Sequence, residues 1–150
     1  MKQVIKNIQN KLKEVPGIKY IDEDSGQLDY YSPNMPVMWP CVLIDLDQIA
    51  YSDMGRNRHK QPQLRQQATG QVVLTIANLK LTNSSGKATA TQQQAALQIW
   101  DIIQGVHSAL QGFRPTDYTG AMIRTAHNRV KRDDGIQEYR ITYSIGFHDV

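Results

Sequence analysis

Residues 133–147 read DDGIQEYRITYSIGF, and this stretch decides the fold. Large apolar or aromatic residues occupy every second position, with polar residues between them: Tyr139, Ile141, Tyr143, Ile145 and Phe147. A period of two is typical of a strand with one buried face and one wet face. The Asp134-Gly135 dipeptide just before it is a strong hairpin-turn signal. We therefore predict a strand over 137–147, joined through 131–135 to an antiparallel strand over 121–130.

Shorter apolar runs upstream predict three more strands, at 18–21, 41–49 and 71–81. In the run 41–49, Val42, Ile44 and Leu46 point to one face, while Asp45 and Asp47 point to the other. The run 71–81 alternates in the same way. These strands provide further apolar faces that helices can cover.

Two stretches have the period of an amphipathic helix. In 3–15 the apolar stripe is Val4, Ile8, Leu12 and Val15, and Pro16-Gly17 ends the helix. The second helix is predicted over 91–110, with Thr89 or Thr91 as N-cap and Gly112 after its end. Its predicted buried stripe is Ala96, Ile99, Trp100, Ile103, Val106, His107 and Leu110.

The predicted order is α-β-β-β-α-β-β, which indicates a single α+β domain over residues 1–150. We expect an antiparallel or mixed sheet with two main helices packed on one face. Strands two and three should form a long hairpin. No GxGxxG or GxxxxGK[ST] motif follows a predicted strand, so nucleotide-binding motifs are absent from the sequence.

Composition excludes several classes of protein. The chain has 150 residues, of which 40% are hydrophobic, too many for a disordered protein. No run approaches the roughly 20 apolar residues of a membrane-spanning helix, so we expect no membrane partner. The single cysteine, Cys41, cannot form an internal disulfide, which favours folding in a reducing cytoplasm. The net charge of +3 is small for a dedicated nucleic-acid binder.

The segment 54–71 is a polar, basic connection without any acidic residue, and we expect it to be the extended tip of the long hairpin. Its candidate contact residues are Arg56, Arg58, His59, Lys60 and Arg65. Connections beyond about 12–15 residues tend to be functional or disordered. Three interpretations stay open: a solvated tip, a segment that orders against a protein partner, and a contact to nucleic-acid phosphates.

The segment 29–40 contains three prolines and is predicted to be irregular. It is unusually apolar for a connection, with Tyr30, Tyr31, Met35, Met38 and Trp39. Either these side chains pack over the sheet, or they form a docking surface for a partner or another subunit.

The sequence contains no pattern typical of a catalytic or cofactor site. His59, His107, His127 and His148 lack metal-ligand spacing, and we expect no metal, cofactor or catalytic residue. The acidic run 22–26 fails as a calcium loop, because the position of the bidentate glutamate is Pro33. Asp45 and Asp47 are best explained as a solvent face, and Cys41 as a small buried side chain.

The order of elements resembles that of the tail terminator, or tail completion, proteins of tailed bacteriophages and prophages. The likeness rests on the first helix, the strand WPCVLIDL at 39–46, the polar hairpin, the Gln- and Ala-rich helix 92–110 and the final hairpin DDGIQEYRITY at 133–143. The segment 54–71 is longer and more polar than that pattern leads one to expect.

The resemblance implies a non-enzymatic virion protein that assembles in the host cytoplasm into a ring, typically a hexamer. Such a ring caps the tail tube, stops its growth and joins the tail to a neck or head-completion protein. A basic tip facing the lumen would touch passing DNA without sequence preference. The alternatives are a head-completion or neck connector protein, and a nucleic-acid-binding module that uses the segment Arg56–Arg65. A small hydrolase using Asp45 and Asp47 is a weaker alternative.

Overall fold

The computed structural model describes residues 1–30, 35–56, 64–80 and 82–150. In chain order the elements are α1 (Lys2–Leu12), β1 (Tyr20–Glu23), the short 3-10 helix η1 (Gln27–Asp29), β2 (Cys41–Arg56), β3 (Leu64–Leu79), α2 (Ala90–Ala96), α3 (Gln98–Leu110), β4 (Ile123–Val130) and β5 (Ile136–His148). Among these residues, no helix has the length and apolarity needed to cross a membrane.

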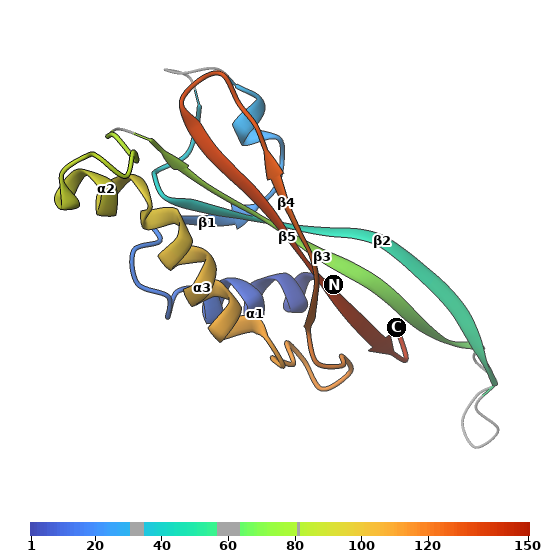
Figure 1. Ribbon diagram of the computed structural model, residues 1–150. Helices are drawn as coiled ribbons and strands as arrows, with labels where there is room; N and C mark the ends of the chain where they lie inside the picture. The colour runs from blue at the N-terminus through green and yellow to red at the C-terminus, as the bar shows by residue number, and fades with distance from the viewer. Residues whose placement is uncertain (31–34, 57–63, 81) are drawn as a thin grey trace.

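The five strands form one mixed sheet in the order β1-β2-β3-β5-β4, shown in Figure 1. β1 runs parallel to β2, while every other neighbouring pair is antiparallel. The predicted α+β class with a mixed sheet is confirmed. β1 covers Tyr20–Glu23, two residues later than predicted, and pairs only with the first four residues of β2.

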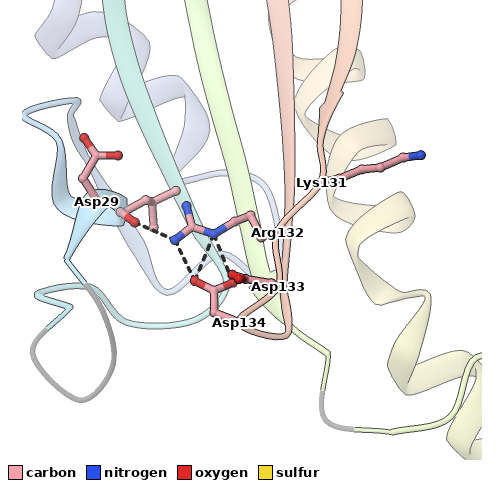
Figure 2. A pocket seen from close by; sticks show the side chains of 6 residues that line it. Asp29, Lys131, Arg132, Asp133 and Asp134 are labelled. Atoms are coloured by element: carbon pink, nitrogen blue, oxygen red, sulfur yellow. Dashed lines mark hydrogen bonds and ion pairs between the residues drawn. The ribbon is translucent and has the colours of Figure 1, made fainter.

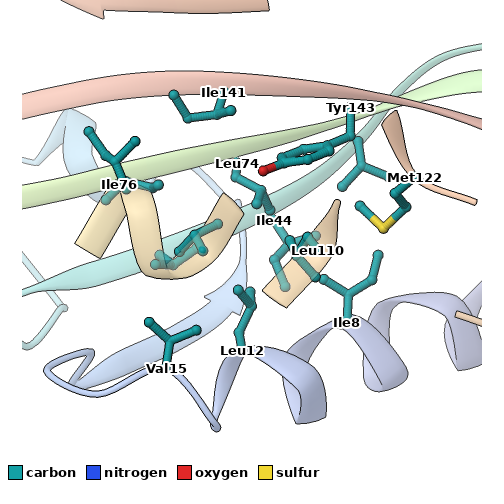
Figure 3. Close-up of a cluster of buried hydrophobic side chains, with 14 of the residues drawn as sticks. Ile8, Leu12, Val15, Ile44, Leu74, Ile76, Leu110, Met122, Ile141 and Tyr143 are labelled. Carbon is teal, nitrogen blue, oxygen red and sulfur yellow. The ribbon is translucent and has the colours of Figure 1, made fainter. Parts of the chain in front are cut away.

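The main core lies between one face of the sheet and the pair α1 and α3 (Figure 1). α1 contributes Val4, Ile8 and Leu12, all with no exposed surface, as its apolar spacing predicts. Figure 3 shows these helices meeting side chains from β2, β3 and β5, among them Ile44 and Tyr143. Full burial of a side chain of this size stabilises the fold by about 1.5–3 kcal/mol.

The opposite face of the sheet carries a second, smaller cluster. It contains Leu28, Cys41, Leu43, Ala77 and Ile136, with partly buried neighbours from the connection before β2. Burial raises the pKa of the Cys41 thiol to about 12, so this cysteine is a neutral packing residue. The sheet is therefore covered on both sides at the end where β1 pairs with β2.

The predicted helix over 91–110 is two helices, because α2 ends at Ala96 and α3 begins at Gln98, with Leu97 between them. The Thr89 side chain accepts a hydrogen bond from the Gln92 N–H at 3.3 Å, which confirms it as an N-cap. At the break, the Gln137 side chain donates to the Ala96 carbonyl oxygen at 3.0 Å. A side chain of β5, 41 positions away, thus bonds the backbone at the break, and helical periodicity cannot predict such a contact.

The long hairpin is more regular than predicted, since β2 and β3 each have 16 residues and pair as far as Arg56 and Leu64. The strands predicted over 41–49 and 71–81 thus extend well into the basic connection 54–71, whose described residues are all strand. The backbone pairs regardless of how polar the side chains are. A bulge at Gln48 and Ile49 interrupts the ladder opposite Gly70. A Cβ at Gly70 would lie 2.9 Å from Ile49 Cγ1, so glycine makes room for the bulge.

Candidate assembly surfaces

The far part of the β2–β3 hairpin runs past the rest of the sheet, as Figure 1 shows. We call residues 52–56 and 64–67 the arm. β1 stops alongside Ile44, and β5 pairs with β3 no further than Gln67. Of the predicted contact residues, Arg58, His59 and Lys60 lie outside the described residues, and Arg56 is described only as the backbone end of β2.

Arg65, the remaining predicted contact residue of the tip, is engaged within the chain. Its guanidinium binds the Asp149 carboxylate through two hydrogen bonds of 2.9 and 3.0 Å. Through this contact Arg65 lowers the pKa of Asp149 below its ordinary value. The Val150 N–H also donates to the Gln66 carbonyl oxygen at 3.2 Å. The two C-terminal residues therefore bind the β3 strand of the arm, and Asp149 neutralises the charge of Arg65.

The predicted aromatic docking residues divide into two groups. Met35 and Trp39 pack against the second core cluster and are partly buried. Tyr30 and Met38 expose 59% and 60% of their surface. Tyr31 lies outside the described residues. Part of the connection therefore covers the sheet, while Tyr30 and Met38 are exposed to solvent.

The groups considered for chemistry do not form a reactive constellation. Asp45 is exposed, and its pKa is raised by partial burial and by the nearby carboxylate of Asp47. His107 contacts the Tyr143 hydroxyl at 3.5 Å at the edge of the core, and partial burial lowers its pKa. Within the described residues, no three His, Cys, Asp or Glu side chains gather closely enough to hold a metal ion.

A buried ionic cluster at the β4–β5 turn was not predicted from the sequence. Figure 2 shows Arg132 bonded to Asp134, with contacts as short as 2.7 Å. The same guanidinium donates to Glu138 at 3.0 Å and to the Leu28 carbonyl oxygen at 2.7 Å. These contacts raise the pKa of Arg132 and lower that of Asp134.

This cluster fixes the turn to η1 across 104 positions of sequence. It borders an open hollow of about 670 Å³ lined by Leu28, Asp29 and residues 131–134 (Figure 2). Because the guanidinium of Arg132 is already occupied by carboxylates and a carbonyl, the cluster serves to hold structure. The other charged residues that line the hollow are Asp29, Lys131 and Asp133.

A second unpredicted feature is an exposed aromatic patch beside β4. Trp100 was predicted to be buried, yet it exposes 45% of its surface. Its ring stacks on the His127 ring of β4, with ring centroids 5.7 Å apart. The centroid of the Tyr139 ring lies 4.9 Å from that of Trp100. Helical periodicity places Trp100 on the sheet side of α3, but β4 lies at the sheet's edge and cannot cover it. Leu97, 38% exposed, lies one turn earlier.

Neither a protein-family model nor a curated protein matches the sequence. Among solved structures, the fold is similar to a chain of the structure described as the virion of a native gene transfer agent (GTA) particle. The two chains share 7% identity, with a TM-score of 0.50. The match covers 97% of this chain and 91% of the other, so the likeness extends over nearly the whole fold.

Proposed function

We propose that this chain is a structural protein of a phage-like particle and acts as a tail terminator. In this role, copies assemble into a ring that ends the tail tube and provides the surface to which a neck or head-completion protein binds. The observation that carries the proposal is the full-length likeness of fold to a chain of a virion particle. The element order that resembles tail terminators in sequence supports the same role.

The surfaces of the molecule suit assembly better than catalysis. A ring of identical subunits needs two different patches on each subunit, one meeting the other on the next copy. The chain offers an arm beyond the sheet, the exposed Tyr30 and Met38, and Trp100 beside β4. Exposed aromatic and methionine side chains are enriched at such interfaces. By contrast, Cys41 and Asp45 lack the partners that a reactive group requires.

Contact with passing DNA is part of the proposal but has narrower support. It depends on the basic residues Arg56, Arg58, His59 and Lys60, because Arg65 is paired with Asp149. Contacts of this kind would be made to phosphates and would weaken with salt.

The test uses tail tubes built from the major tube protein of the particle to which the proposal assigns this chain. Purified protein is added during tube polymerisation, and tube lengths are measured by electron microscopy. We expect short tubes, each with a ring at one end. Tubes of unchanged length with bare ends contradict the terminator role. Rings bound to head connectors and never to tubes indicate a head-completion protein instead.

A further inference from the structure

Within the described part of the chain, the sheet has two long edges without a strand partner, on opposite sides. On one side, β1 covers β2 only as far as Ile44, which leaves the outer edge of β2 open from Asp45 to Arg56. On the other side, β4 is the last strand of the sheet. Among the described residues, the only outward backbone hydrogen bond along β4 joins the Arg124 N–H to the Gln111 side chain at 2.9 Å. Open edges of this length are templates for pairing with another chain.

The backbone groups along β4 can be oriented from the bonds of β5. The Gly146 carbonyl oxygen accepts from Gly120, and the His148 N–H donates to Tyr118, so even-numbered residues of β5 direct their backbone groups toward the β4 side. In an antiparallel ladder this direction alternates. The β4 residues opposite odd-numbered β5 residues therefore point their backbone groups outward. They are Arg124, His127 and Arg129.

The same argument orients the open edge of β2. Gln66 of β3 accepts from Val150 on the side away from β2, so its partner Asp53 directs its backbone groups to the outer edge. Tyr51, two residues earlier and opposite Ala68, has the same orientation. Ile44 agrees with this pattern, since its carbonyl oxygen accepts from Asp24 on the β1 side.

The two edges match in side-chain face and in charge. Arg129 lies opposite Tyr139, and Asp53 opposite Gln66, so both side chains are on the face of the sheet that carries the helices. β4 has two arginines, one histidine and no acidic residue. The open stretch of β2 has three aspartates and one arginine. Opposite charges across a strand pair are favourable, and like charges are not.

Aromatic side chains accompany the charges on the same face. Tyr51 on β2 is 53% exposed. Trp100, which stacks on His127 of β4, is 45% exposed. Large, half-exposed aromatic residues are typical anchors of protein interfaces.

We propose that the outer edge of β4 in one copy pairs with the open edge of β2, around Tyr51 and Asp53, in the next copy. β4 runs antiparallel to β2 because each neighbouring pair between them is antiparallel, so successive copies in the same orientation form an antiparallel junction. The junction brings Arg129 opposite Asp53 on the face that carries the helices, and it continues the sheet from subunit to subunit. This inference rests on the proposed ring and specifies its contact.

The test is a pair of charge reversals in the full chain, read by sedimentation velocity. Asp53→Arg and Arg129→Asp each place like charges across the junction, and we expect each to lower the assembled fraction at least tenfold. The double variant restores opposite charges and is expected to assemble like the wild type. Lys13→Glu, on an exposed residue just after α1, is the matched control and should leave assembly unchanged. Melting curves establish that each variant is folded.

Cysteine crosslinking gives a second measurement that does not depend on charge. The native Cys41 is fully buried, so it does not compete. The double variant Asp53→Cys, Arg129→Cys should form a ladder of covalent oligomers on mild oxidation, while each single variant should not.

The outcomes separate this junction from the ring itself. Wild-type assembly that is insensitive to both reversals, together with no covalent ladder, overturns the junction and leaves the proposed ring standing. A wild-type chain that stays monomeric at every concentration overturns both.

Discussion

The two hairpins of the sheet are each held by an arginine–carboxylate contact, but in very different surroundings. At the β4–β5 turn, the side chains of Arg132, Asp134 and Glu138 are 15%, 15% and 3% exposed. At the arm, the side chains of Arg65 and Asp149 are 40% and 55% exposed. Ion pairs in water contribute little to stability, whereas breaking a buried one leaves an uncompensated charge. The turn is thus fixed by the chain itself, while the arm is lightly held and available to a partner.

The largest effect should come from breaking the buried cluster. Arg132→Leu leaves Glu138 almost fully buried without its main cation, and we expect a loss of about 3 kcal/mol in the free energy of unfolding. Urea denaturation measures it. Arg140→Gln is the control, because Arg140 is 56% exposed and only 3.5 Å from the same carboxylate. Equal losses in the two variants would show that burial of the arginine does not determine how much its contact with Glu138 stabilises the fold.

The bulge at Gln48 and Ile49, next to the arm, should be sensitive to added side-chain volume. Gly70→Ala places a Cβ within 2.9 Å of Ile49, and we expect a loss of about 1–2 kcal/mol. At Gly146 in β5, a Cβ meets nothing within 4 Å, so Gly146→Ala should be close to neutral. Thermal unfolding of both variants tests whether the bulge opposite Gly70 needs this space.

The cluster should also leave a signature in acid. Arg132 lowers the pKa of Asp134 in the folded state, so the contact contributes stability above the unfolded pKa and loses it as pH falls through the folded one. Asp134→Asn removes this dependence. Between pH 7 and pH 3 the wild type should lose more stability than the variant. If the free energy of unfolding falls with pH equally in the wild type and in Asp134→Asn, the Arg132–Asp134 contact does not contribute this stability.

The smallest effect is expected at the arm. Arg65→Ala removes an exposed ion pair, so the melting temperature should change little. At high salt the pair is screened, and the change should be smaller still. If Arg65→Ala lowers the free energy of unfolding as much as Arg132→Leu does, the arm is a rigid part of the domain.

Strands and helices with local signals could be predicted from the sequence. The alternation of Tyr139 to Phe147 gave β5, and the spacing of Val4, Ile8 and Leu12 gave α1. Thr89 was a correct cap. These features depend on periodicity and capping, and the residues that determine them lie within a few positions of one another in the sequence.

Features that depend on distant partners could not be predicted in this way. Arg132 reaches Leu28 across 104 positions, and Gln137 supports the helix break at Leu97. Trp100 follows the apolar period, yet it lies at the edge of the sheet, where the described residues leave it 45% exposed. The open edges of β2 and β4 depend on sheet order, which no local pattern encodes.

The mass of the purified wild-type chain in solution decides whether copies of this chain assemble into a ring. We expect a discrete, closed assembly of about six subunits in sedimentation equilibrium, with unassembled 17.0 kDa chains in the minority at high concentration. A single 17.0 kDa species across the whole concentration range would contradict it.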